Sequence, residues 1–205
     1  EDRKVLKDKL SHNQALTTSG PLHPDLNIIQ ALPGNLAIWR DKSALSADRA
    51  VALCWVLHML GDLHQPLHNV SLFSADLFPQ GDKGGNSVKV LVNNKNIPLH
   101  ALWDSSPSLL SDLLIYDDEM NINIDINDKP ILPLITGWLA YHRELAIHHV
   151  YTDEVREQLI AKIDSQSNDP IRLNKNYIDK ILPLIKKQIH LAGHRIAALI
   201  DDDEY

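Results

Sequence analysis

Two histidine–aspartate pairs are the residues of this sequence best suited to bind metal ions. His58 and Asp62 form the first pair, and His100 and Asp104 form the second. On a helix, residues four apart lie on one face, so each pair can present a ring nitrogen and a carboxylate to the same ion. His68 lies between the two pairs, just after a proline. These donors, without thiolates, predict a zinc site, with room for more than one ion.

A structural role is the alternative for each pair taken alone, because an imidazole–carboxylate hydrogen bond also stabilises a fold. Two such pairs around a further histidine favour the metal. Structural zinc usually has cysteine ligands, whereas catalytic zinc keeps a position open for water. Two or more neighbouring ions can stabilise both the attacking and the leaving oxygen of a phosphoester. The pattern therefore favours metal-assisted phosphoester hydrolysis over a structural site.

The composition is that of a globular domain and argues against a non-catalytic protein that binds nucleic acid tightly through a basic surface. The chain has 205 residues, 44% of them hydrophobic, with 11 histidines and a formal net charge of −7. A protein that bound nucleic acid through a basic surface would carry the opposite charge, although bound divalent ions can supply local positive charge. The single cysteine, Cys54, forms no internal disulfide and is predicted to be a small buried hydrophobic residue. No apolar run is long enough to span a bilayer.

The fold class predicted from the hydrophobic pattern is all-α, a mostly helical single domain over residues 1–205 with one small β-hairpin. The hairpin is expected from Val88–Val92 and Ile97–Leu99, and a short, weak helix or a frayed start from residues 1–14. A polar, exposed loop is expected over Asp117–Lys129. The helices are expected at these ranges: Asn27–Arg40 (interrupted at Pro33-Gly34), Ala47–Leu63, His100–Asp104, Leu134–Val150, Asp153–Ile163 and Ile178–Ile200.

The helix over Ala47–Leu63 is predicted to be buried, because apolar residues lie on most of its faces. Ser46 is expected to cap its N-terminus. Trp55, Trp103 and Trp138 are expected in the core. On a buried helix, the polar His58 and Asp62 each need a partner or a metal ion.

Three segments together resemble the signature of a known enzyme family. They read L-H-M-L-G-D-L-H-Q-P-L-H, G-D-K-G-G-N and L-H-A-L-W-D. They are similar in residue type and spacing to the zinc-dependent single-strand nucleases, of which fungal nucleases S-one and P-one are the best known. The resemblance is strong over about 50 central residues and implies a helical, phospholipase C/zinc nuclease-like fold with three zinc ions. It also implies cleavage of RNA and single-stranded DNA to 5′-phosphorylated products, with removal of 3′-phosphates from nucleotides.

The resemblance also implies roles for particular residues. Asp62 matches a carboxylate that bridges two ions, with His58 beside it, whereas the remaining ion would be held by three ligands: His68, His100 and Asp104. A zinc-bound water, rather than a side chain, would be the nucleophile. A glycine-rich loop containing Asp82, Gly84, Gly85 and Asn86 would cross the site. We expect Asn86 to contact the substrate and His64 to lie behind the ligands or at the surface.

The sequence departs from the family before His58. The family has four further ligands upstream, among them an N-terminal tryptophan, and this chain has no match for them. We therefore expect the N-terminal part of the family domain to be missing and one to two zinc ions to be held by the residues present.

The resemblance implies single-stranded nucleic acid or a 3′-nucleotide as substrate. A secreted or periplasmic location is implied as well, without stable membrane association or an obligate protein partner. Two other functions stay open: a zinc phospholipase C-like lipase, and a catalytically inactive helical domain with a structural metal.

Overall fold

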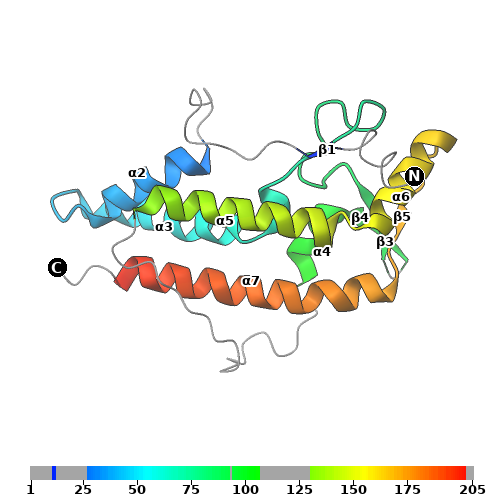
Figure 1. The fold of residues 1–205 in the computed structure, drawn as a ribbon. Coiled ribbons are helices and arrows are strands. Elements are labelled where there is room, and N and C mark those ends of the chain that lie inside the picture. The colour runs from blue at the N-terminus through cyan, green and yellow to red at the C-terminus, as the bar shows by residue number, and fades with distance from the viewer. Residues whose placement is uncertain (1–10, 13–26, 93, 107–129, 202–205) are drawn as a thin grey trace.

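The computed structural model describes residues 11–12, 27–92, 94–106 and 130–201, and these are mostly helical (Figure 1). The helices are α2 (Ile28–Arg40), α3 (Ser46–Leu63), α4 (Leu99–Ser105), α5 (Ile131–Leu145), α6 (Asp153–Ser165) and α7 (Lys175–Asp201). A 3-10 turn, η1 (Pro66–His68), follows α3, and a π-helical turn, η3 (Ala146–Val150), continues α5. Among these described residues no helix has the length and hydrophobicity of a membrane-spanning segment. The helical fold class is confirmed.

A three-stranded sheet replaces the single hairpin expected from the sequence. Strand β3 (Lys89–Val92) pairs antiparallel with β4 (Lys95–Pro98), with Lys89 opposite Pro98. The addition is β5 (Ile171–Arg172), which pairs parallel with β3. Two residues are too few to show the alternation of apolar and polar side chains that predicts a strand. The pairing of β5 therefore could not be expected from its own sequence and depends on the tertiary fold.

A second short pairing contradicts part of the helix expected over residues 1–14. Ser11–His12 form strand β1, which pairs antiparallel with β2 (Leu72–Phe73). The rest of that segment, and the loop expected over Asp117–Lys129, lie outside the described residues.

The helix α2 begins with a capping box. The Asn27 side-chain oxygen accepts from the backbone N–H groups of Ile29 and Gln30, and the Gln30 side chain accepts from the Asn27 N–H. The expected interruption at Pro33 is wrong, since the helix runs through it. Pro33 removes one backbone hydrogen bond, but the buried leucines on either side of it, Leu32 and Leu36, hold both parts of the helix against the core.

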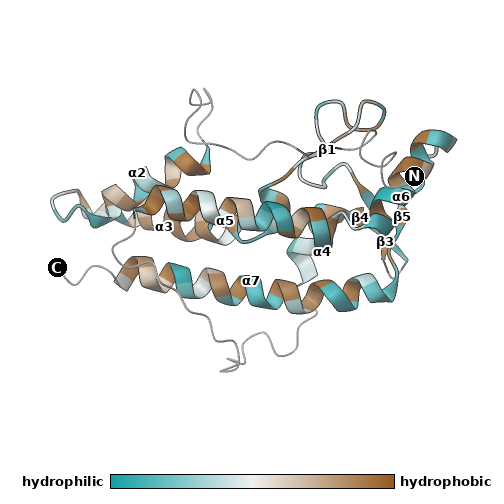
Figure 2. Ribbon diagram, in the orientation of Figure 1, coloured by the Kyte–Doolittle hydropathy of each residue, from teal (hydrophilic) through white to brown (hydrophobic). Residues whose placement is uncertain are grey.

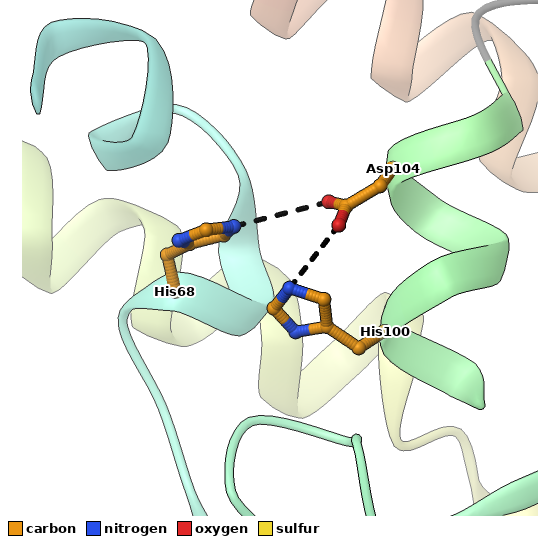
Figure 3. Close-up of side chains that lie close together, drawn as sticks. All are labelled: His68, His100 and Asp104. Atoms are coloured by element: carbon orange, nitrogen blue, oxygen red, sulfur yellow. Dashed lines mark ion pairs between the residues drawn. The ribbon is translucent and has the colours of Figure 1, made fainter. Parts of the chain in front are cut away.

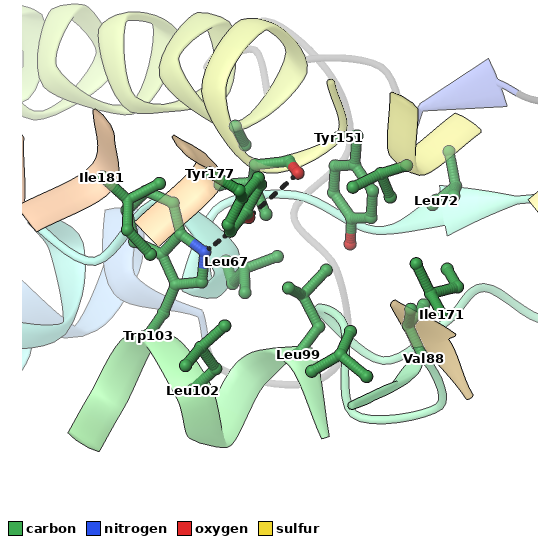
Figure 4. Packing of buried hydrophobic residues seen from close by; sticks show 14 of the residues in the cluster. Leu67, Leu72, Val88, Leu99, Leu102, Trp103, Tyr151, Ile171, Tyr177 and Ile181 are labelled. Carbon is green, nitrogen blue, oxygen red and sulfur yellow. Dashed lines mark hydrogen bonds between the residues drawn. The ribbon is translucent and has the colours of Figure 1, made fainter. Parts of the chain in front are cut away.

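The buried side chains form two clusters. One joins α2, α3 and α5 around Leu60 and Trp138. The other joins η1, the sheet, α4, α6 and the first half of α7 (Figure 4). In this second cluster the indole N–H of Trp103 donates to the Tyr177 hydroxyl, which donates to the Val150 carbonyl. Figure 2 shows apolar and polar residues alternating along α7, as expected for a helix with one face on the core.

The prediction that α3 is buried on most faces is wrong. Its inner face is buried, but Cys54 is exposed and Trp55 is 52% exposed. Trp103 and Trp138 are buried as expected. The hydrophobic pattern was misleading because apolar residues occur on the outer face of α3 as well as on the inner face. Ser46 is also not the cap: the cap position is Leu45, without a side-chain hydrogen bond.

Candidate metal centre

The five predicted ligands come from three neighbouring elements. His58 and Asp62 lie in the last two turns of α3, His68 ends η1, and His100 and Asp104 lie on α4. Pro66 separates α3 from η1, because the helix ends at Leu63 before the proline ring would clash. This turn brings His68 back toward the last turn of α3.

Asp104 lies between two imidazole rings, as Figure 3 shows. Its carboxylate oxygens are 3.2 Å from Nε2 of His100 and 3.8 Å from Nε2 of His68. The three donor atoms all lie within 4.8 Å of one another. We call these three residues the α4 half of the centre.

The other two predicted ligands are joined to this half through His68. Nε2 of His58 is 3.2 Å from the Asp62 carboxylate, and the same carboxylate oxygen is 3.7 Å from Nδ1 of His68. We call His58 and Asp62 the α3 half. The structure therefore brings all five residues into one continuous chain of contacts, with one ring nitrogen of His68 facing each half.

The donors of the α4 half fit a divalent metal ion of the zinc type. The Nδ1–H of His100 donates to the Gly84 carbonyl at 2.7 Å, which leaves Nε2 free to bind an ion beside Asp104. A carbonyl partner of this kind usually orients a metal-ligating histidine. Two nitrogens and a carboxylate also match the donor set of catalytic zinc sites, which keep a further position open.

Gln65 supports the same half. Its side-chain nitrogen Nε2 donates to Asp104 at 2.9 Å, and its side-chain oxygen Oε1 accepts from the backbone N–H of Leu67 at 2.5 Å. Sequence reasoning passed over Gln65, although it lies within the Q-P-L-H segment. The signal that could have found it is its place one residue before Pro66, where a side chain can cap the following 3-10 turn.

The glycine-rich loop explains why His100 has a carbonyl partner. Gly84 has φ +61° and Gly85 has φ +81°, values that favour glycine. A β-carbon at Gly84 would collide with the Leu67 carbonyl oxygen. The loop can therefore approach η1 and α4 closely enough for its carbonyl to reach His100.

Asp82 is buried inside this loop rather than facing the centre. One of its carboxylate oxygens accepts from the Leu72 N–H at 2.9 Å, and the other accepts from the Tyr151 hydroxyl at 2.5 Å. Burial, together with the neighbouring Asp82 carboxylate, raises the pKa of Tyr151 well above its ordinary value, so the hydroxyl stays a donor. Asp82 thus shapes the loop by joining it to β2 and to the end of η3.

Two other predicted residues make hydrogen bonds that do not involve the five donors. Asn86 is exposed, and its side-chain nitrogen donates to the Lys83 carbonyl within the loop. His64 is buried: one ring nitrogen bonds the Leu60 carbonyl, and the other accepts from Arg195 at 2.7 Å. Burial lowers the pKa of His64 to about 3, so its ring is neutral. His64 therefore joins α3 to α7 behind the centre.

A cavity of about 790 Å³ lies on the α3 side of the centre, between α2, α3 and η1. Asp62 and His68 face it, and the half-exposed Trp55 lies at its wall. The Trp55 ring also meets the His58 ring edge-on, with 5.9 Å between their centres. Asp62 and His68 are therefore accessible from this side.

A helical domain that holds histidine and aspartate donors on neighbouring helices, with a glycine-rich loop beside them, could hold a divalent metal ion. The family model described as S1/P1 Nuclease matches residues 7–203. The chain belongs to that family.

Named relatives agree with this family. Endonuclease 2 of Arabidopsis thaliana is 27% identical over 154 residues, which cover 73% of this chain and 50% of the relative. Nuclease S1 of Aspergillus oryzae is 28% identical over 173 residues, covering 73% of this chain and 53% of the relative. Endonuclease 3 of Arabidopsis thaliana is 42% identical over a shorter stretch of 53 residues, covering 26% of this chain and 15% of the relative. The chain spans about half the length of the first two relatives.

Proposed function

We propose that this protein is a zinc-dependent phosphodiester hydrolase that cleaves single-stranded DNA or RNA to 5′-phosphorylated products, with 3′-nucleotidase activity. The observation that carries the proposal is the α4 half: two imidazole nitrogens and a carboxylate within reach of one ion, in a chain of the S1/P1 nuclease family. A zinc ion bound there would supply Lewis-acid stabilisation of charge on a phosphoester. A secreted or periplasmic location belongs to the same proposal.

The side chains have separate tasks in this proposal. His68, His100 and Asp104 hold the ion, and the Gly84 carbonyl orients the His100 ring through its Nδ1–H. Asp62 faces His58 on one side and His68 on the other, and in this proposal its carboxylate would be shared between two ions. Asn86, at the exposed rim of the loop, is available to a substrate strand.

Zinc content and hydrolysis together test the function. The purified protein, dialysed against zinc and then against buffer, should retain one to two ions per chain and cleave a single-stranded oligonucleotide. The products should carry 5′-phosphates, and excess chelator should stop the reaction. Absence of zinc in the dialysed protein would overturn the proposal.

Two competing functions give different results in the same experiment. A zinc phospholipase C would hydrolyse phosphatidylcholine and leave oligonucleotides intact. A helical domain with a structural metal would retain an ion and hydrolyse neither substrate. The family match favours the nuclease over both alternatives.

A further inference from the structure

A cavity of about 390 Å³ lies between the glycine-rich loop, the sheet and α6, and none of the five predicted metal ligands lines it. Its walls are the loop and the segment just before it, the first residue of β3, the first residue of β5 and the second half of α6. Figure 1 shows α6 and the sheet together at one end of the molecule, away from α2. The cavity is therefore distinct from the candidate metal centre but shares the glycine-rich loop with it.

Three lysines line this cavity, which we call the lysine cavity. They are Lys83 in the loop, Lys89 at the start of β3 and Lys162 in the last turn of α6. Among the described residues that line the cavity, none is aspartate or glutamate. Lys83 and Lys89 are exposed and, within the described part of the chain, neither pairs with a carboxylate. Because like charges that converge repel one another, the lysine cavity favours an anion.

Lys162 is held in place more firmly than the other two lysines. Its side chain is partly buried, and its ammonium group donates to the backbone carbonyl of Asp169. An ammonium group has three donors, so two remain for a ligand. Burial lowers the pKa of Lys162, and an anion beside the ammonium group would offset that effect. The Asp169 carboxylate, which accepts from the Ser167 hydroxyl, does not line the cavity.

The remaining polar walls indicate which anion fits. Gln80, Ser87 and Asn168 bring amide and hydroxyl groups to the cavity beside the lysines. Lysine ammonium groups, together with serine, asparagine and glutamine side chains, are the groups with which proteins contact the phosphate oxygens of nucleic acids. Because two of the three lysines are exposed, a phosphate within a longer strand can reach the cavity.

We propose that the lysine cavity binds a backbone phosphate of the nucleic-acid strand other than the phosphate that is cleaved. The proposal rests on the proposed function, because the substrate there is a polyanion with several phosphates. Lys83 directly precedes Gly84, whose carbonyl bonds His100. One peptide unit, about 3.8 Å between α-carbons, therefore joins the cavity wall to the residue that orients a metal ligand. A strand bound at the metal centre could thus place a neighbouring phosphate at the lysines.

Salt-dependent binding tests this site without requiring hydrolysis. The zinc-loaded protein is titrated with a fluorescein-labelled single-stranded phosphorothioate oligonucleotide, and the association constant is measured by anisotropy at several salt concentrations. Lys89→Gln should weaken binding about threefold, the effect of one exposed ion pair. The slope of log K against log salt concentration should become shallower by about 0.7, the contribution of one phosphate contact on a single strand. Lys83→Gln should have the same two effects.

Lys95→Gln is the matched control. Lys95 is an exposed lysine on β4, the strand that pairs with β3, and it does not line the cavity. The control removes the same charge from the same sheet, so it should leave the affinity and the slope unchanged. A methylphosphonate strand of the same sequence has no backbone charge and should not distinguish Lys89→Gln from Lys95→Gln.

The outcomes separate this site from the reaction. If Lys83→Gln and Lys89→Gln bind the oligonucleotide as Lys95→Gln does, the site is wrong, and cleavage of oligonucleotides by the unaltered protein would leave the proposed function standing. If the two variants lose affinity and slope but the unaltered protein cleaves no oligonucleotide, the function is wrong and the site stands. Displacement of the labelled strand by polyglutamate as effectively as by unlabelled oligonucleotide would assign the cavity to acidic peptides and overturn the proposal.

Discussion

The two halves of the candidate metal centre use the same kinds of residue but differ in how the rest of the fold supports them. In the α4 half, the backbone of the glycine loop orients His100, and Gln65 holds Asp104. In the α3 half, His58 is 62% exposed, and its described partners are the Asp62 carboxylate and the edge of the Trp55 ring. Helical spacing alone therefore brings donors together, whereas a separate supporting loop fixes the direction of a ring.

Replacing Gly84, which lets the glycine-rich loop approach His100, should have the largest effect on stability and zinc binding. Gly84→Ala places a side chain at φ +61° and against the Leu67 carbonyl, so the loop must move away from His100. We expect a loss of at least about 2 kcal/mol in the free energy of unfolding and loss of the ion held by the α4 half. Chemical denaturation and zinc analysis measure the two effects.

A glycine beside the α3 half provides the matched control. Gly61 lies inside α3, next to Asp62, and a β-carbon there would meet nothing within 4 Å. Gly61→Ala should be neutral or stabilising by up to about 1 kcal/mol, because alanine favours a helix. Equal losses of zinc in the two variants would contradict the difference between the halves.

Replacing the two helical histidines one at a time tests the comparison directly. His100→Ala should lower zinc affinity at the α4 half by at least about 100-fold, since even a residue that only supports a ligand contributes about 10- to 100-fold. His58→Ala should leave that ion in place, because His58 does not contact His68, His100 or Asp104 through any described interaction. Competition with a chelator of known affinity measures both. Unchanged zinc content in His100→Ala would sink the ligand assignment.

Removing the Tyr151 hydroxyl, which supports the glycine-rich loop through Asp82, should have a smaller effect on zinc affinity. Tyr151→Phe leaves a buried oxygen of Asp82 without its donor, which costs about 1–3 kcal/mol. We expect zinc affinity at the α4 half to fall with the stability of the loop, and by less than in His100→Ala. Denaturation and chelator competition on the same samples relate the two quantities. A loss of stability with fully retained zinc affinity would show that the loop and the ion are independent.

The sequence predicted which histidine and aspartate side chains lie together better than it predicted their surroundings. The His-x-x-x-Asp spacing depends only on helix geometry, so the pairing of His100 with Asp104 could be expected from the order of the residues alone. The Gly84 carbonyl that orients His100 lies 16 residues earlier in the chain, and only the tertiary fold brings it there. Most helices were expected for the same local reason, because their periodic apolar faces are readable in sequence.

The errors have physical causes as well. Cys54 and Trp55 were expected in the core, yet both are on the outer face of α3, because hydrophobicity does not say which face of an apolar helix has a partner. Strand β5 was missed because two residues are too few to show the alternation of apolar and polar residues that is typical of a strand. Gln188 was passed over because a glutamine within a long amphipathic helix looks like a surface residue, whereas here it is buried against His142.

The smallest expected effect concerns histidines that lie outside both halves. His142 is fully buried and bonds the Trp138 carbonyl and Gln188. Burial lowers the pKa of His142 below its ordinary value of 6.5, so the unfolded chain takes up a proton that the folded protein does not. Stability from this group is therefore present above pH 6.5 and is lost as the pH falls below 6.5 toward the lowered pKa. Denaturation of the metal-free protein between pH 7.5 and about 5 should show this loss, and His142→Gln should reduce the slope. An equal slope in His142→Gln would assign the pH dependence to other groups, and retention of the slope after zinc loading would show that it does not arise from histidines that bind the ion.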